Sequence, residues 1–315
     1  MKIFKKVSIT VLILLAIYMI FRYIARRCVF YGGVPPTLTK LHVKGSIFIR
    51  EDVYIKDTGL SGKSFKICDP NPPNDSLKDK VVLVFGPNAD SSARIVDSIR
   101  ICDNEDCFYQ LARRGATIIG IDYRGYGNSA PISRFKISEN TVYKDAEDMY
   151  NYVRTEMKVA PENIITFGYS MGAAAASHVL EYASKKNEKL CGVVLASPIN
   201  NLSSAASAFT FSALGKVTSF LCGSKLNTEK NLSNVKDKAV PIFICSGGNN
   251  DVLSLKSTRL DQKCKELGFK NITVNIGKDN CEHGNLYGMF DSEKTGSKSS
   301  YTDFIENLGK QKKDS

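Results

Sequence analysis

Near the middle of the chain stands the run Ile164-Ile165-Thr166-Phe167-Gly168-Tyr169-Ser170-Met171-Gly172-Ala173-Ala174-Ala175-Ala176. Its β-branched and aromatic start predicts a buried strand, and the small residues that follow predict a helix. A strand, a tight turn and a helix are the context in which Gly-x-Ser-x-Gly holds its serine in a strained turn above a sheet. Gly168 and Gly172 leave space where a Cβ would crowd the neighbouring strand or helix. The alternative, a chance match in a loop, is disfavoured by these flanks.

Apolar runs alternate with amphipathic helical patterns on both sides of this turn. The helix expected over 140–157 places its apolar residues on one face at helical spacing. The apolar runs that read as strands cover 81–85, 116–121, 163–167, 191–196, 241–245 and 271–276. This alternation predicts an α/β fold, with a mostly parallel central sheet and helices on both faces.

The segments around this pattern are assigned in the same way. Strand-like stretches at 41–49, 53–55 and 65–68 predict antiparallel strands at one edge of the sheet. Helices are expected over 91–101 and 107–113, as one helix or two, over 254–267, and over 300–308 at the end of the domain.

The N-terminus has the composition of a membrane anchor. Residues 7–21 are almost uninterrupted apolar, and continuing to residue 25 gives 19 residues, near the ~20 that cross a bilayer as a helix. No small-x-small cleavage site follows, and Arg26-Arg27 come directly after the run, so an uncleaved anchor is favoured over a signal peptide. We therefore expect a single-pass membrane protein with its anchor in residues 1–27.

The rest of the chain divides into four parts. Residues 28–40 contain Gly-Gly and Pro-Pro and predict a linker. Residues 41–310 form the α/β domain, in which 200–239 interrupts the strand–helix rhythm and predicts a small helical cap or lid. Residues 311–315 are a polar tail. Cys28, just after the anchor, is a possible S-acylation site, although an unmodified cysteine fits equally well.

The charge and the cysteine content of the chain indicate its binding partner and its cellular compartment. The formal net charge is +11, and residues 1–27 hold six basic residues and no acidic one. Basic residues that flank an apolar segment suit an anionic membrane surface, so the lipid bilayer is the expected partner. The sequence has no zinc-finger spacing, RNA-binding motif or basic helix, so no nucleic-acid partner is expected. Nine cysteines without framework spacing favour a reducing compartment.

A serine nucleophile needs a base within hydrogen-bond reach and a carboxylate to orient that base. The chain has three histidines. His42 lies upstream in an edge region, and His178 lies two turns along the helix that leaves Ser170. His283 follows the last strand at the carboxyl edge of the sheet, where ligands bind in such folds, and is the expected base.

Asp251 is the expected acid, because it follows the strand at 241–245 through a Gly-Gly-Asn-Asn turn. The alternative role for Asp251 is an N-cap of the next helix. Asp90 and Asp122 also follow strands but precede the serine, whereas Ser170, Asp251, His283 is the chain order of α/β hydrolases. The developing oxyanion needs N–H donors, and we expect these from the backbone of Met171 and of Asn88.

These residues resemble the α/β-hydrolase superfamily over about residues 41–310, most closely its single-pass, membrane-anchored members. The resemblance rests on four motifs: residues 122–129 (Asp-Tyr-Arg-Gly-Tyr-Gly-Asn-Ser), the Gly-x-Ser-x-Gly motif, Gly-Gly-x-x-Asp ending at Asp251, and His283-Gly284-Asn285. It implies an acyl-thioesterase that removes palmitate from proteins, a lipid esterase or lipase, or a peptidase. One departure is that Gly86-Pro87-Asn88-Ala89 stands where the family usually has His-Gly-Asn-Ala.

The sequence therefore predicts a membrane-anchored serine hydrolase that cleaves a carboxylic ester or thioester through an acyl-enzyme. The substrate would be an acylated small molecule or a lipidated protein, and no metal or organic cofactor is required. A peptidase or amidase with the same triad is one alternative. A catalytically inactive, membrane-anchored binding module is the other, motivated by the altered loop at Gly86-Pro87.

Overall fold

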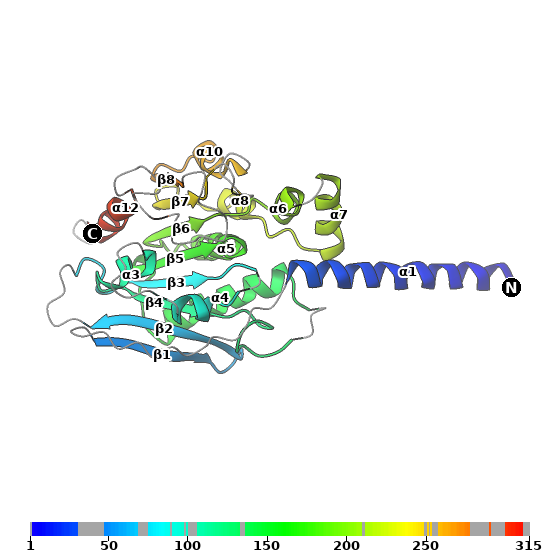
Figure 1. Ribbon diagram of the computed structural model, residues 1–315, viewed down its shortest axis with the longest axis horizontal. Coiled ribbons are helices and arrows are strands. Elements are labelled where there is room, and N and C mark those ends of the chain that lie inside the picture. Colours follow the sequence, from blue (N-terminus) through cyan, green and yellow to red (C-terminus); the bar gives the residue numbers. More distant parts are fainter. Residues whose placement is uncertain are drawn as a thin grey trace.

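The computed structural model of the chain describes residues 2–30, 47–68, 75–88, 90–97, 99, 106–132, 136–209, 212–248, 251, 253, 258–277, 290 and 300–310. Within these residues the strands form one eight-stranded sheet with the order β1-β2-β4-β3-β5-β6-β7-β8 (Figure 1). The strands are β1 (Ile47–Ile55), β2 (Leu60–Cys68), β3 (Val81–Phe85), β4 (Thr117–Ile121), β5 (Ile164–Tyr169), β6 (Gly192–Ala196), β7 (Ile242–Ser246) and β8 (Ile272–Ile276).

The sheet is parallel from β4 to β8, and β1 and β2 add an antiparallel edge. In the register, Phe85 of β3 lies opposite Gly168 of β5, and Tyr169 lies opposite Ala196 of β6. The carboxyl ends of these strands therefore meet at one edge, as expected for a ligand-binding edge in such sheets.

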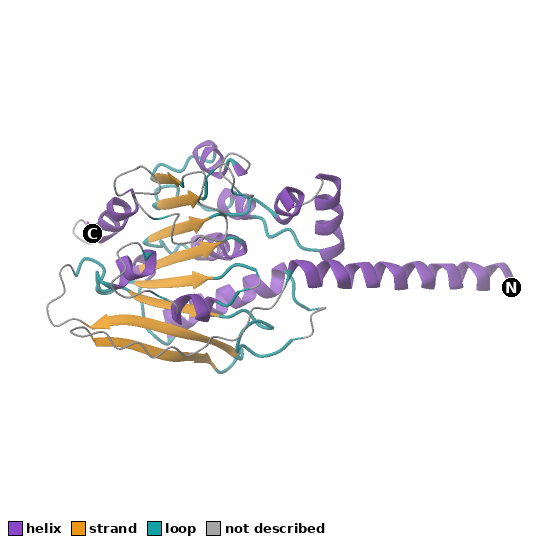
Figure 2. Ribbon diagram, in the orientation of Figure 1, coloured by secondary structure: helices purple, strands orange, loops and turns teal. Residues whose placement is uncertain are grey.

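Helices cover both faces of the sheet (Figure 2). One face is covered by α4 (Glu139–Thr155), α5 (Met171–Lys185), α8 (Thr228–Ser233) and α10 (Leu260–Glu266), and the other by α2 (Ser92–Asp97), α3 (Cys107–Ala112) and α12 (Ser300–Lys310). Along β3 the side chains alternate: Leu83 belongs to the first core, and Val82 and Val84 belong to the second. A strand buried on both faces reads as an uninterrupted apolar run, which explains the signal in the sequence.

The structure refines three expectations of the sequence. Residues 47–49 and 53–55 of the predicted stretches belong to one strand, β1, which pairs with β2 over nine residues, and residues 41–46 lie outside the described part of the chain. The described residues of 91–113 form two helices, α2 and α3, which is one of the two expected arrangements. The helix expected from residue 254 is described from Leu260, and residues 254–257 lie outside the described part of the chain.

The N-terminal residues form the helix α1 (Lys2–Val29), which extends away from the sheet in Figure 1. This helix was expected from the sequence. Among the described residues, however, no helix is both long enough and apolar enough to cross a membrane.

The region 200–239 is helical, and its parts differ in where they pack. Helices α6 (Leu202–Phe209) and α7 (Ser212–Cys222) pack on each other at the carboxyl edge, and α7 contacts α1 (Figure 1). We call these two helices the lid. Helix α8 instead packs on α5, where the Asn231 amide donates to Ala174 O at 3.0 Å. The cap-like part of the expected insertion is therefore α6 and α7.

Candidate active site

Ser170 stands in the turn between β5 and α5, and its backbone is strained. Its φ of 54° and ψ of −113° lie near the first central position of a type II′ turn, which favours glycine. The turn is held on both sides: Ser170 N donates to Ala196 O at 2.9 Å, and Ala173 N donates to Ser170 O at 3.1 Å. The residue is 8% exposed. The surrounding structure thus maintains a conformation that a serine alone disfavours.

The two glycines of the motif are required by close backbone contacts. A Cβ on Gly168 would lie 2.3 Å from Gly172 O, and a Cβ on Gly172 would lie 2.0 Å from Phe85 O. Helix α5 consequently begins directly against the ends of β5 and β3. The crowding inferred from the sequence is present at both positions, and it brings Ser170 close to the loop that follows β3.

Asp251 follows β7 and is buried, with 3% exposure. Its Oδ2 accepts hydrogen bonds from Ser197 Oγ at 2.7 Å and from Gly247 N at 2.9 Å, and its Oδ1 accepts one from Leu253 N at 2.9 Å. Three donors stabilise an ionised carboxylate at this edge. Helix α10 has Arg259 at its N-cap, and residues 254–257, where the expected helix would begin, lie outside the described part of the chain.

An apolar pocket of about 340 Å³ contains Ser170 in its wall. Asn88 and Met171, the two expected oxyanion residues, line the same pocket. The side-chain oxygen of Asn88 accepts a hydrogen bond from Tyr126 Oη at 3.1 Å, which fixes the loop after β3. The structure therefore brings Asn88 and Met171 to Ser170 even though Gly86-Pro87 departs from the usual loop. The remaining lining is mostly apolar: Val29, Ile199, Leu202, Ala205, Leu226 and Leu253, with Cys28, Ala206 and Thr218.

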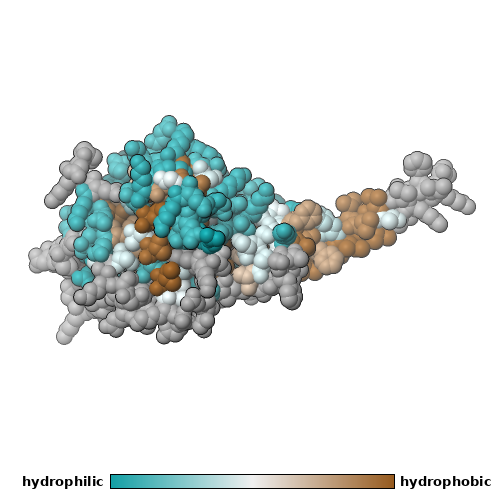
Figure 3. Space-filling model, turned by 90° about the horizontal axis from the view of Figure 1, so that it is seen from above, coloured by the Kyte–Doolittle hydropathy of each residue, from teal (hydrophilic) through white to brown (hydrophobic). Residues whose placement is uncertain are grey.

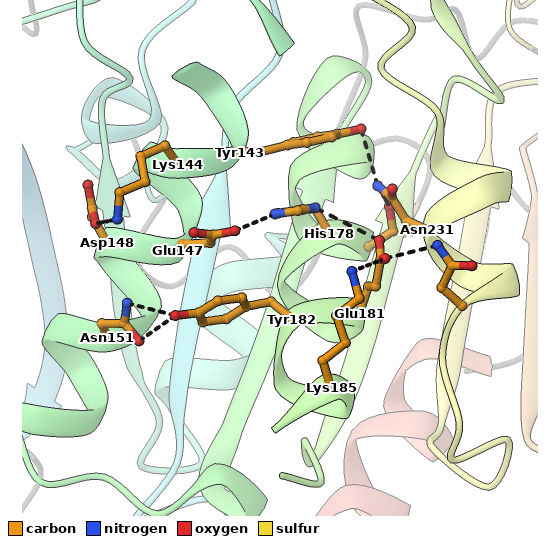
Figure 4. A network of polar contacts seen from close by, with 12 residues as sticks. Tyr143, Lys144, Glu147, Asp148, Asn151, His178, Glu181, Tyr182, Lys185 and Asn231 are labelled. Atoms are coloured by element: carbon orange, nitrogen blue, oxygen red, sulfur yellow. Dashed lines mark hydrogen bonds and ion pairs between the residues drawn. The ribbon is translucent and has the colours of Figure 1, made fainter. Parts of the chain in front are cut away.

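The expected base, His283, lies outside the described residues, and so does His42. His178 is described, and it faces α4 rather than Ser170. Its Nε2 lies 2.9 Å from Glu147 Oε1, and its ring stacks on Tyr143 with centroids 4.1 Å apart (Figure 4). His178 therefore joins α5 to α4. Among the described residues, no group of three His, Cys, Asp or Glu could hold a metal.

Asp122, at the end of β4, has a structural role. It is buried, and it accepts hydrogen bonds from Ser91 Oγ at 2.6 Å and Ala93 N at 3.0 Å. Burial raises the pKa of its carboxyl, against these hydrogen bonds. A Cβ on Gly127 would lie 1.7 Å from its Oδ2. The motif at 122–129 thus folds around Asp122 and ties α2 to the sheet.

Comparison with known proteins is consistent with this geometry. The family model described as serine aminopeptidase, S33, matches residues 100–240. The crystal structure of an alpha-beta hydrolase from Vibrio vulnificus superimposes with a TM-score of 0.63 at 24% identity, over 82% of this chain and 81% of that one. An esterase from Pyrococcus furiosus gives a TM-score of 0.56 at 15% identity, over 89% and 98%. The chain belongs to the α/β-hydrolase superfamily.

Curated relatives match this α/β hydrolase over shorter stretches. A multifunctional-autoprocessing repeats-in-toxin protein of Vibrio vulnificus is 28% identical over 200 residues, 62% of this chain and 4% of the toxin. Alpha/beta hydrolase domain-containing protein 17C of Xenopus tropicalis is 36% identical over 87 residues, 28% of this chain and 25% of that protein. The match thus spans a small part of each relative's length.

Sequence reasoning missed three contributors to the site of this α/β hydrolase. Ser197 directly follows β6 at the carboxyl edge of the sheet. This position could have predicted that its side chain contacts Asp251, which follows the neighbouring strand. No pattern in the sequence indicated that Val29 of α1 and Thr218 of α7 line the pocket, because the residues that line it are far apart in sequence.

Proposed function

We propose that this chain is a membrane-attached serine hydrolase that cleaves a carboxylic ester or thioester of an acyl chain. The observation that carries the proposal is Ser170, held in a strained turn in the wall of an apolar pocket. A strained turn between a strand and a helix is how α/β hydrolases expose their nucleophile. A mostly apolar lining suits the hydrocarbon part of an acyl group.

The proposed reaction proceeds through an acyl-enzyme. Ser170 Oγ attacks the carbonyl carbon while His283 takes the hydroxyl proton, and the N–H groups of Met171 and Asn88 donate to the oxyanion. His283 then protonates the leaving alkoxide or thiolate as its bond to the acyl carbon breaks. Asp251 orients His283. A water molecule, deprotonated by His283, releases the carboxylic acid and restores Ser170.

Membrane attachment is supported by the surface of α1. Many of the exposed large apolar side chains of the described residues lie on this helix, and six basic residues flank its apolar run. Apolar surface of this extent in water is unfavourable and marks an interaction site. We propose that α1 attaches the domain to a lipid bilayer, with an acylated lipid or lipidated protein as the substrate.

The test is hydrolysis by full-length protein in detergent. The substrates are 4-nitrophenyl esters of increasing chain length and the matching thioesters, compared for wild type, Ser170→Ala and Ser233→Ala. Ser233 is an exposed serine of α8 that serves as the matched control. We expect Ser170→Ala to lower kcat/KM by at least about a thousandfold and Ser233→Ala to have no effect. Equal turnover by wild type and Ser170→Ala would exclude this mechanism.

Peptide-bond hydrolysis is the second candidate, favoured by the serine aminopeptidase description of the matching family model. An aminoacyl 4-nitroanilide in the same panel decides between the two, because amide cleavage with little ester cleavage would support the peptidase. Ser170 would remain the nucleophile in either case. A folded wild type that turns over none of these substrates would support the non-catalytic binding module.

A further inference from the structure

Helix α1 is fixed to the lid at one joint. Arg26 Nε donates to Cys222 O at 2.9 Å, at the carboxyl end of α7, where a cation is favoured by the helix dipole. Gly223, with φ of 59°, lets the chain pass close to Arg22, whose Nη2 would lie 2.9 Å from a Cβ there. The Tyr18 and Phe220 rings are 6.3 Å apart. Helices α1 and α7 therefore form one unit.

This joint also forms one end of the Ser170 pocket. Cys28 and Val29 enter the lining from α1, and Thr218 enters it from α7. Ser170 is 8% exposed whereas Cys28 is an exposed residue. The pocket thus runs from the buried serine to the surface at the place where α1 meets the lid.

The surface beside this end of the pocket is apolar and basic. Phe220 is 70% exposed and Val217 is 49% exposed, and their i, i+3 spacing places them on one face of α7. The exposed apolar residues of α1 lie between Val11 and Ile24, and Figure 3 shows them as a projecting hydrophobic surface. The sequence has no acidic residue in 1–30 or 201–223. Such a surface complements anionic lipid.

We propose that α7 docks on the bilayer together with α1, so that the acyl chain of the substrate enters the pocket directly from the lipid, between the two helices. The inference rests on the proposed function and adds the route of the substrate. An acyl chain that passes from lipid to an apolar pocket does not cross water, so the cost of exposing its methylene groups is avoided. The lid is then a lipid-contacting surface as well as a cover.

The docking is tested with fluorescence, because the chain contains no tryptophan. Phe220→Trp introduces a single reporter, and Met157→Trp is the matched control. Met157 is 37% exposed and lies between α4 and β5, at the opposite edge of the sheet. The full-length proteins are bound to vesicles of phosphatidylcholine with a minor share of phosphatidylserine, with and without bromine in the middle of the acyl chains.

We expect the emission of the F220W protein to shift to shorter wavelength on vesicles and to be quenched by the brominated lipid, and that of the M157W protein to be unchanged. Vesicle-bound F220W protein without quenching would overturn the proposal. A shift that occurs without vesicles and grows with protein concentration would also overturn it, because a second copy of the chain would then cover this face.

The route is tested by comparing two substrates: a long-chain ester within the vesicles and a soluble short-chain ester. Phe220→Asp should lower the ratio of vesicle to soluble rates about tenfold or more, and Met157→Asp should preserve it. An unchanged ratio in Phe220→Asp would refute the route. If the wild type hydrolyses neither ester, the proposed function fails. The quenching of F220W emission by brominated lipid still tests whether α7 docks on the bilayer.

Discussion

The backbone of Ser170 gives a prediction that separates strain from chemistry. With φ of 54° and ψ of −113°, a residue other than glycine is strained by about 1–3 kcal/mol. Ser170→Gly and Ser170→Ala both remove the hydroxyl, so their difference contains the strain. Glycine relieves this strain, but glycine is also more flexible in the unfolded chain, which lowers the free energy of unfolding by about 0.5–1 kcal/mol. We expect the S170G protein to be more stable than S170A by about 1 kcal/mol, with neither active.

The assay is urea unfolding followed by circular dichroism at 25 °C, with all variants in the same detergent. Ala173→Gly is the control, because Ala173 lies in α5, where glycine lowers the free energy of unfolding by about 1 kcal/mol. If S170G is instead less stable than S170A by a similar amount, Ser170 carries no strain, and the reasoning about the turn is refuted.

Three further predictions concern the surroundings of the site. Gly172→Ala places a Cβ 2.0 Å from Phe85 O and should lower the free energy of unfolding by about 1–3 kcal/mol or more, whereas Gly192→Ala places one 2.9 Å from the end of the Leu308 side chain and 3.4 Å from Pro241 O, and should cost less in the same urea titration. Ser197→Ala removes one of the three donors to Asp251 found among the described residues, and it should cost about 1–3 kcal/mol of stability and lower kcat more than it changes KM; an unchanged kcat would exclude a positioning role. Asp145 of α4 accepts hydrogen bonds from Arg124 N at 2.7 Å and from Arg124 Nε at 2.5 Å, but burial still raises the pKa of its carboxyl from 3.8 to about 6. The stability that this group contributes is therefore full below pH 3.8 and is lost as the pH rises through 6. Asp145→Asn should remove this loss, and parallel curves of unfolding free energy against pH for the two proteins would contradict it.

The sequence predicted the sheet and the placement of Ser170 well, because both depend on local patterns. Strands buried on both faces are uninterrupted apolar runs, and the starts of β3, β5, β6 and β7 agree with the predicted ones to within one residue. The apolar residues of α4 expected on one face are all buried: Val142, Ala146, Met149, Tyr150 and Val153. The placement of Asp251 at the carboxyl edge followed from chain order, and the structure shows it buried there.

The rest of the site depends on contacts between distant residues, which local patterns do not encode. Arg26 and Cys222 are separated by 196 positions, and their hydrogen bond joins α1 to the lid. The prediction that 28–40 is a linker did not place Cys28 or Val29 near the site, yet both line the pocket. The expected transmembrane span stays a prediction, because among the described residues no helix is long and apolar enough to cross a membrane.

The most direct test of the central claim, that Ser170 is an activated nucleophile, is covalent labelling. Full-length protein and its Ser170→Ala variant are treated in detergent with a fluorophosphonate, and the modified peptide is identified by mass spectrometry. The account predicts one adduct on Ser170 and none in the variant, with reduced labelling in Asp251→Asn. A folded wild type that takes up no label, or an adduct that persists in Ser170→Ala, would contradict it.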